Sequence, residues 1–193
     1  MYKPALIFSS FLLLMVPCYG YEGKVIKVYD GDTLTVKTKD KKIHKVRLAR
    51  IDCPEKDQSH GEAARKHVSD LVLNQTVSVN VRDTDRYKRE VADVVLPGGI
   101  CLNESLVLQG HAWWYQQYAK DDLKLKGYQD EARAAKRGLW SNDLAMAPWQ
   151  WRKERKAEKK TALERVKEFL SLPATIREMH RQRIYWEVWN ENR

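Results

Sequence analysis

Charged side chains stand close together in three short segments of the first half of the chain: Asp30–Thr33, which is acidic, and Arg47–Glu55 and Asp85–Arg89, which hold both acidic and basic residues. Asp32 and Asp52 offer hard anionic oxygen atoms, which without a His or Cys cluster select a hard divalent cation rather than zinc. The arginines offer planar guanidinium groups, which bind phosphate oxygens in pairs and stay charged at any working pH. A cation beside a base is what attack on a phosphodiester requires, because charge builds on the phosphoryl oxygens.

Each of these residues also has an ordinary structural interpretation. Asp30-Gly31 is typical of a turn, and Asp52 of a strand end. Glu55, which follows Pro54, is typical of a helix start or an exposed surface. The five histidines are scattered along the chain and predict no metal site. The chemistry therefore depends on whether the fold brings the three segments together.

The pattern of apolar residues and turn signals predicts the elements that must do this. Strands are expected at residues 24–29, 33–37, 43–49, 76–81 and 91–96, with Asp30-Gly31 as the first hairpin turn. Helices are expected at residues 60–73, 103–109 and 121–137; Asn103 should cap the second, and Gly110 and Gly138 should end the second and third. This order favours a five-stranded barrel with helices packed outside, since closure removes exposed sheet edges.

The C-terminal segment differs in composition. Residues 152–193, after Trp149-Gln150-Trp151, hold twelve Lys or Arg and seven Asp or Glu, interrupted by Pro173. Two charged helices are expected, at residues 153–170 and from 175 to about 189. Their apolar stripe is thin, so partial disorder of the isolated tail is one expectation, and docking on an anionic membrane surface or a partner is another. Deep membrane insertion is not expected.

The first twenty residues are predicted to be an export signal. Lys3 precedes a short apolar run from Ala5 to Val16, and Cys18 and Gly20 supply small residues for cleavage after Gly20. A lipid-attachment role for Cys18 and a buried helix are the alternatives. Cleavage would remove one positive charge from a formal net charge of +9 and leave +8. An exported, periplasmic or extracellular protein with a polyanionic partner is expected.

Cleavage would also leave two cysteines, Cys53 and Cys101. In an oxidising compartment they could form one disulfide, or stay as two separate buried thiols. A thiol nucleophile is not expected at Cys53, because no partner histidine is evident.

The chemistry-bearing segments, together with Asn103–Gly110 and Gly138-Leu139-Trp140-Ser141, resemble the staphylococcal nuclease family in order and spacing over about residues 22–142. The resemblance implies an oligonucleotide-binding-type (OB-fold) five-stranded barrel with three helices, a mixed β and α fold. It divides the chain into a signal at residues 1–20, the nuclease-like domain at 21–142 and a basic helical extension at 143–193.

The resemblance also implies roles for single residues. Calcium would be held by Asp32, Asp52 and the main-chain carbonyl of Cys53, with water completing the shell. Two carboxylates imply weak binding, with a dissociation constant on the order of 0.1–1 mM. Glu55 matches the general base that takes a proton from the attacking water. Arg47 and Arg89 match the two arginines that bind the phosphate and stabilise the charge that builds on it.

Substrate-binding residues follow less directly. Arg86 and Tyr87 match residues that contact a terminal phosphate, whereas Lys88 stands where the family usually has Gly. Tyr118 is the expected stacking residue, although the spacing also points to Gln116. The aromatic cluster that contains Trp113, Trp114, Tyr115 and Tyr118 could stack on bases or could be core.

The activity implied by the resemblance is calcium-dependent, sugar-nonspecific hydrolysis of DNA and RNA to 3′-phosphate products by a monomer. Single-stranded or flexible substrate should be preferred, because the scissile phosphate must be approached in line. The alternative is a nucleic-acid-binding OB-fold module without catalysis, since some members of the superfamily keep the barrel and lose the acidic and arginine residues. Here Asp32, Asp52, Glu55 and both arginines are present.

Overall fold

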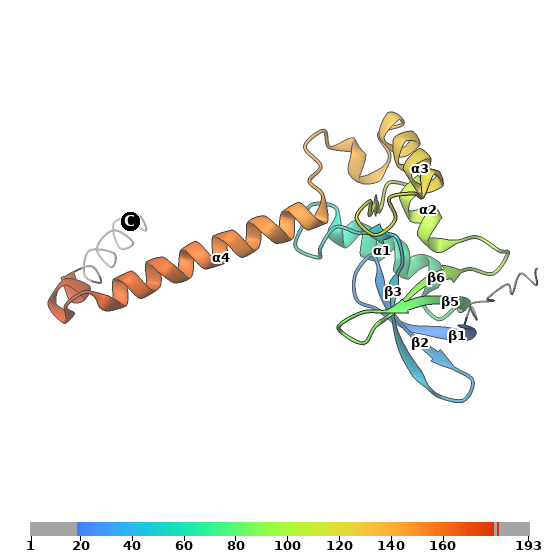
Figure 1. Cartoon of the computed structure of the whole chain (residues 1–193), viewed down its shortest axis with the longest axis horizontal. Helices are drawn as coiled ribbons and strands as arrows, with labels where there is room; N and C mark the ends of the chain where they lie inside the picture. The colour runs from blue at the N-terminus through green and yellow to red at the C-terminus, as the bar shows by residue number, and fades with distance from the viewer. Residues whose placement is uncertain (1–18, 180, 182–193) are drawn as a thin grey trace, which may run out of the picture. The chain divides into compact units, whose positions relative to one another are not determined.

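The computed structural model describes residues 19–179 and 181, which form two compact units divided between Asp143 and Leu144 (Figure 1). Most of the predicted export signal lies outside the described residues. In the described part of the chain, no helix combines the length and the apolar character needed to cross a membrane.

The first unit is built on a closed barrel of five strands, as predicted. The strands follow one another around the barrel in the order β1 (Tyr19–Val28), β2 (Thr33–Thr38), β3 (Ile43–Leu48), β6 (Glu90–Val95) and β5 (Thr76–Thr84). All neighbours are antiparallel except β3 and β6, which pair in parallel. That parallel pair closes the sheet. In it, Val46, which precedes Arg47, lies opposite Glu90, which follows Arg89.

The first strand is longer than predicted. It begins at Tyr19 instead of Lys24, because its early residues pair with β5 as far as Tyr19 opposite Val81. The hydroxyl of Tyr21 also donates to Glu90 across 2.5 Å. Cross-strand pairing rather than apolar pattern thus determines where this strand starts.

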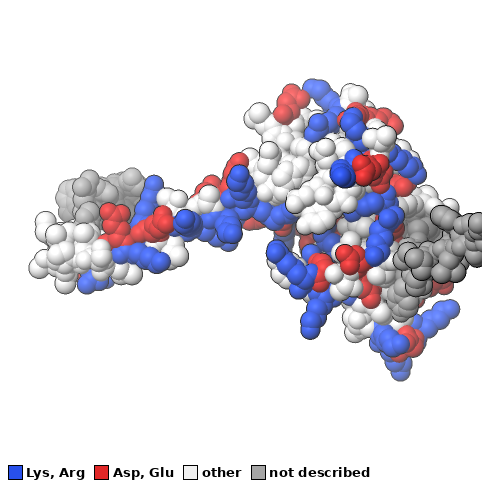
Figure 2. All heavy atoms as spheres, in the orientation of Figure 1, with Lys and Arg blue, Asp and Glu red and all other residues white. Residues whose placement is uncertain are grey.

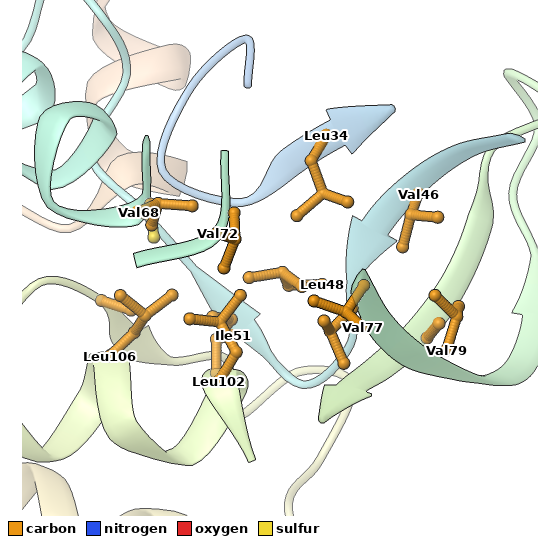
Figure 3. Packing of buried hydrophobic residues seen from close by; sticks show 14 of the residues in the cluster. Leu34, Val46, Leu48, Ile51, Val68, Val72, Val77, Val79, Leu102 and Leu106 are labelled. Atoms are coloured by element: carbon orange, nitrogen blue, oxygen red, sulfur yellow. The ribbon is translucent and has the colours of Figure 1, made fainter. Parts of the chain in front are cut away.

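Three helices cover the barrel: α1 (Gly61–Val72), α2 (Leu102–Leu108) and α3 (Leu123–Ala134). Their buried residues meet the inward side chains of the strands in one core (Figure 3). Val68 and Val72, one helical turn apart on α1, point into it together with Leu102 and Leu106 of α2. Two short strands, β4 (Ile51–Asp52) and β7 (Trp113–Trp114), pair with each other outside the barrel.

Two predicted helix ends are wrong. Asn103 does not cap α2 but lies inside it, fully buried, and the cap position belongs to Cys101. The helix α3 ends at Ala134 and not at Arg137, because Lys136 takes a positive φ of 50° and turns the chain. Gly138 is instead required for a close approach of two backbone segments, since a Cβ there would come within 2.2 Å of the carbonyl oxygen of Gly110. This contact precedes a one-turn helix, η1 (Gly138–Ser141).

The second unit contains one long helix, α4 (Pro148–Ser171). It starts five residues before the predicted Lys153, because Pro148 suits the first turn of a helix, where its missing N–H is not needed. The helix stops before Pro173, as predicted, and residues 174–179 are again helical. The remainder of the second predicted helix lies outside the described residues, apart from Arg181.

Candidate functional site

One arginine joins the two carboxylates that the sequence predicted as metal ligands. Arg47 projects from β3, and its Nη2 donates to Oδ1 of Asp52 across 2.7 Å, while its Nη1 forms an ion pair with Asp32. Asp52 is 1 % exposed and Asp32 6 %, so both carboxylates are removed from water. Charge-assisted hydrogen bonds are strong in such surroundings. The fold therefore brings together residues from β3, β4 and the turn that leads into β2.

The turn before β2 fixes the carboxylate of Asp32. Oδ1 of Asp30 accepts hydrogen bonds from the backbone N–H groups of Asp32 (3.0 Å) and Thr33 (2.6 Å). From the other side, the backbone N–H of Cys53 donates to Oδ2 of Asp32 across 2.9 Å. Gly31 is required between them, because a Cβ at that position would lie 2.6 Å from Cβ of Cys53. The Asp-Gly-Asp motif is thus a turn and also the support of a site residue.

Asp30 itself adds a third carboxylate to this region. Burial raises the pKa of Asp30 above its usual value, although the charges of Arg47 and Arg89 and hydrogen bonds from Thr33 act in the opposite direction. The sequence interpretation treated Asp30 only as a turn residue. The hydrogen bonds of Asp30 agree with its place in the predicted turn. Its carboxyl group near Arg47 and Arg89 is a further feature of the site that the local sequence pattern does not reveal.

Glu55 is placed by a tight turn between β4 and α1. Its backbone N–H donates to Oε1 of Gln58 (3.1 Å), and the backbone N–H of Gln58 donates back to the carbonyl of Glu55 (2.9 Å). Gly61, the first residue of α1, lies directly against this carbonyl, since a Cβ at residue 61 would be 1.8 Å from the oxygen. Glu55 is partly exposed, whereas Cys53, two residues before it, is buried.

Cys53 lies at the centre of this group of charges. Burial raises the pKa of its thiol well above the ordinary value, the charge of Arg47 opposes this, and three carboxylates reinforce it: Asp30, Asp52 and Glu55. The thiol is therefore not a nucleophile at neutral pH. Cys53 and Cys101 are both free thiols in the structure, so of the two arrangements that the sequence left open, it shows separate thiols.

Arg89 reaches the same region from the hairpin between β5 and β6. Asp85 holds it, because Oδ1 of Asp85 accepts from the backbone N–H of Arg89 (2.9 Å) and Oδ2 accepts from its Nε (2.7 Å). Although burial opposes ionisation of Asp85, these hydrogen bonds from Arg89 lower its pKa. Nη1 of Arg89 lies 3.4 Å from Oγ1 of Thr33, next to Asp32. The guanidinium group is thus oriented toward the acidic residues.

The same hairpin presents the predicted substrate-binding residues to solvent. Tyr87 is 65 % exposed, and its ring lies 4.8 Å from the guanidinium carbon of Arg86 and 5.5 Å from that of Arg89. Lys88, between Tyr87 and Arg89, takes a positive φ of 61°. This is the left-handed conformation that glycine adopts without strain, so the backbone at residue 88 suits the Gly that the resemblance leads one to expect there.

The aromatic cluster after Gly110 divides into core and surface. Trp113 and Trp114 are buried, and Trp113 packs edge-on against Trp140 with ring centroids 4.4 Å apart. Tyr118 is 73 % exposed, and its ring lies 4.9 Å from that of Tyr115. The two tryptophans therefore belong to the core, and Tyr118 remains accessible for stacking.

A cluster of three histidines escaped the sequence interpretation. His60 Nε2 lies 3.0 Å from Nδ1 of His111, and the rings of His67 and His111 stack with centroids 4.0 Å apart. The three come from the start of α1, from α1 itself and from the loop after α2, so their spacing in the chain gave no signal. Because His60 precedes Gly61, the cluster adjoins the turn that carries Glu55.

A second group missed by the sequence interpretation orients the chain beyond β3. Nη2 of Arg50 donates to Oδ1 of Asp93 across 2.8 Å, and its Nη1 forms an ion pair with Asp122, the N-cap of α3. The carbonyl of Arg50 accepts from the backbone N–H of Tyr115 (2.9 Å). Arg50 thus connects β6, α3 and the segment around Tyr115 to the segment that carries Asp52.

The donor set of the site suits a hard cation. Two carboxylates, those of Asp32 and Asp52, share the guanidinium group of Arg47, and two more lie nearby: Asp30, which feels the charges of Arg47 and Arg89, and Glu55, which acts on Cys53. Nowhere in the described part of the chain do three or more His, Cys, Asp or Glu side chains converge in a metal-binding arrangement. A cation here would combine carboxylate oxygens with main-chain oxygen and water, the ligands that Ca²⁺ accepts.

Comparison with known proteins identifies similar chains. Residues 45–142 match the family model described as staphylococcal nuclease homologue. An uncharacterized endonuclease from Escherichia coli O157:H7 is 41 % identical over 137 residues, which cover 71 % of this chain and 88 % of the relative. An uncharacterized endonuclease from Haemophilus influenzae is 44 % identical over 133 residues (69 % and 74 %), and a micrococcal nuclease from Shigella flexneri 38 % over 155 residues (75 % and 88 %).

Proposed function

The chain belongs to the staphylococcal nuclease family, and on that premise we propose that it hydrolyses phosphodiester bonds of DNA and RNA with calcium as cofactor and leaves 3′-phosphate products. The relatives are named as endonucleases and as a micrococcal nuclease, which supports nucleic-acid hydrolysis by this chain. Beyond hydrolysis itself, we propose calcium as the cofactor, both DNA and RNA as substrates, and products that end in a 3′-phosphate.

One observation carries the proposal: the buried carboxylates of Asp32 and Asp52 share the guanidinium group of Arg47, with Arg89 and Glu55 close by. Placing two like charges in a nearly dry site is costly unless cations accompany them. Arg47 supplies one such cation. The further carboxylates of Asp30 and Glu55 nearby favour a second cation.

In this proposal Asp32, Asp52 and the carbonyl of Cys53 hold Ca²⁺. When bound, the ion supplies positive charge to the phosphoryl oxygens as negative charge builds on them. Only two carboxylates contribute, so a dissociation constant on the order of 0.1–1 mM is expected, as in extracellular calcium sites. Such weak binding agrees with the proposed export of the chain under the direction of residues 1–20.

The side chains of this chain divide the remaining work. Glu55 takes a proton from the attacking water, which its partly exposed position permits. Arg47 and Arg89 each bind phosphoryl oxygens with two N–H groups and hold the phosphate against the acidic residues. Arg86 and Tyr87, exposed on the hairpin that carries Arg89, bind a terminal phosphate, and Tyr118 stacks on a base.

The experiment compares cleavage of a single-stranded DNA and an RNA with Ca²⁺ and with chelator. Glu55→Gln should lower the rate by about 10²- to 10⁴-fold, and Arg89→Lys by about 10²- to 10³-fold. Matched controls are Glu62→Gln and Arg65→Lys, the same substitutions in an exposed ion pair on α1, which should leave the rate unchanged. Release of phosphate by a phosphatase specific for 3′ ends reports the 3′-phosphate product.

Two outcomes would reject the proposal. Cleavage that persists in chelator would exclude calcium as the cofactor. Binding of both nucleic acids by the wild-type chain without any cleavage in Ca²⁺ would show a binding module that has kept the barrel and lost catalysis.

A further inference from the structure

The helix α4 carries its positive and negative charges on opposite sides. At about 100° per residue, seven Lys and Arg side chains fall within a sector of about 160°: Arg152, Lys153, Arg155, Lys156, Lys159, Lys160 and Lys167. The glutamates fall in the remaining part of the circumference: Glu154, Glu158, Glu164 and Glu168. Arg165 is the exception on the acidic side. Figure 2 shows Lys and Arg atoms over much of the visible surface of this helix.

This arrangement differs from that of an ordinary solvated helix, in which opposite charges four residues apart stabilise each other. Between residues 152 and 160, three pairs at that spacing join two basic residues: Arg152 with Lys156, Arg155 with Lys159, and Lys156 with Lys160. An opposite pair at four-residue spacing occurs at the end of this stretch, Lys160 with Glu164 at 4.0 Å, and Arg155 has the opposite charge of Glu158 three residues away. Repulsion along one side weakens an isolated helix, and a polyanion lying against that side would relieve it.

The position of the apolar residues favours a nucleic acid over a membrane surface. A helix that lies in a bilayer interface places apolar side chains at the centre of one face and lysines at its borders. Here Arg152, Lys156 and Lys159 occupy the centre of the basic side. Apolar side chains share that side before and after this stretch: Trp149 at the start of the helix, and Leu163 and Val166 farther along, where both are about half exposed. Between Arg152 and Lys160, α4 therefore offers charge without a large apolar side chain to insert.

We propose that the basic side of α4 between Arg152 and Lys160, which we call the basic strip, binds the sugar-phosphate backbone of the substrate and retains long nucleic acids on the enzyme. The inference rests on the proposed function. The strip lies beyond residue 142, where the match to the family model ends. It spans about 12 Å at 1.5 Å per residue, a length over which a nucleic acid strand presents several phosphates.

The test keeps the composition of the chain and changes only the position of its charges. In the rearranged variant Glu154→Lys, Lys156→Glu, Glu158→Lys and Lys159→Glu are combined, so net charge and residue content are unchanged. The three basic pairs become opposite pairs, which stabilises the helix instead of weakening it. Circular dichroism of the full-length protein should show equal or greater helix content, so loss of binding cannot be attributed to an unfolded tail.

Binding of a thirty-nucleotide single strand is measured in chelator at several salt concentrations, and cleavage is measured separately in Ca²⁺. We expect the variant to bind at least tenfold more weakly at about 0.1 M salt, with a slope of log affinity against log salt that is smaller by about two. Cleavage of a trinucleotide should be unchanged, whereas the KM for the long strand should rise.

The outcomes separate this inference from the proposed function. Equal affinity and equal salt slope in the two proteins would overturn the basic strip and leave the proposed function intact. A wild-type chain that binds the strand through the strip but never cleaves it would reject only the proposed function. Flotation with vesicles of phosphatidylcholine and phosphatidylglycerol gives the third comparison: if the rearrangement abolishes vesicle binding and leaves strand binding unchanged, the strip binds membranes and the inference is wrong.

Discussion

Gly61 and Glu55 are in such close contact that the first helix can begin only with glycine. A Cβ at residue 61 would lie 1.8 Å from the carbonyl oxygen of Glu55 and 2.7 Å from its carbonyl carbon. The backbone N–H of Gly61 also donates to the carbonyl of Gln58 (2.9 Å), and so closes the turn that starts at Glu55. The start of α1 therefore determines where the proposed general base lies.

Gly61→Ala should displace Glu55 by the distance that the added methyl group requires, on the order of one ångström. Misplacement on that scale lowers catalytic rates by about 10²-fold, so kcat should fall to that extent with KM less affected. Single-turnover cleavage in saturating Ca²⁺ measures this.

Gly127→Ala is the matched control, because nothing lies within 4 Å of a Cβ at that position of α3. It should keep full activity and raise the free energy of unfolding by about 0.5–1 kcal/mol, since alanine favours helix. Full kcat in Gly61→Ala would mean that the turn does not position Glu55.

Lys88→Gly should stabilise the protein. Lys88 has a φ of 61° in the hairpin beside Arg89, a conformation that costs a residue with a side chain about 1 kcal/mol more than glycine. Urea unfolding should show a gain of about 0.5–1 kcal/mol. Lys41→Gly, at a φ of 66° in the turn between β2 and β3, should give a similar gain and leave cleavage unchanged.

A third variant separates backbone geometry from charge at residue 88. Lys88→Ala removes the charge and keeps the side chain at positive φ. If the charge governs substrate affinity, Lys88→Ala and Lys88→Gly should raise KM alike. If geometry governs it, only Lys88→Gly should differ from the wild type. No gain of stability in Lys88→Gly would show that the hairpin imposes no strain.

The barrel and the main residues of the site could be predicted because each has a local signal. Alternating apolar residues marked four of the five strands to within a few residues, and Asp-Gly marked the first turn. The site residues stand at strand ends and turns, where their order in the chain is visible. The pairing of β3 with β6, which brings Arg89 to the acidic residues, follows from closure of the sheet.

The features that were missed depend on contacts distant in the chain. Asn103 has the residue type of a helix cap, but burial gives its side chain three backbone partners in other elements. Arg50 follows a strand like many solvated arginines, and only the fold places Asp93 and Asp122 beside it. The ring contacts of His111 likewise join it to residues far away in the chain. Local sequence carries no signal for such pairings.

Asn103→Ala should destabilise the protein by about 2–4 kcal/mol, because it leaves buried backbone groups without partners. Nδ2 of Asn103 donates to the carbonyls of Ala49 (3.0 Å) and Ala92 (3.1 Å), and Oδ1 accepts from the backbone N–H of Val94 (3.1 Å). Urea unfolding in chelator measures the loss. Gln109→Ala, at the exposed end of the same helix, should change stability by less than about 0.5 kcal/mol. If Asn103→Ala also lowered the free energy of unfolding by less than about 0.5 kcal/mol, water would be taking over the hydrogen bonds of the Asn103 side chain.

The histidine cluster should make the protein less stable in mild acid. Burial lowers the pKa of His111 from 6.5 to about 4, and the charges of His67 and His60 act in the same direction. Burial also lowers the pKa values of His60 and His67. Because each pKa is lower in the folded chain, the unfolded chain takes up protons first as pH falls below about 6.5. Stability contributed by the neutral His111 ring is therefore complete above that pH and is lost progressively down to about pH 4.

His111→Phe tests this dependence, because phenylalanine can keep the ring contact with His67, now 4.0 Å between centroids, and cannot be protonated. Between about pH 7 and pH 4.5 the wild type should lose on the order of 1–2 kcal/mol more stability than the variant, an amount reduced by solvent screening of the half-buried ring. Urea unfolding at several pH values in chelator gives the two curves. Parallel curves would show that His111 is not protonated differently in the folded and unfolded chains, and any acid sensitivity would then have to come from other groups, such as His60 and His67 or the carboxylates.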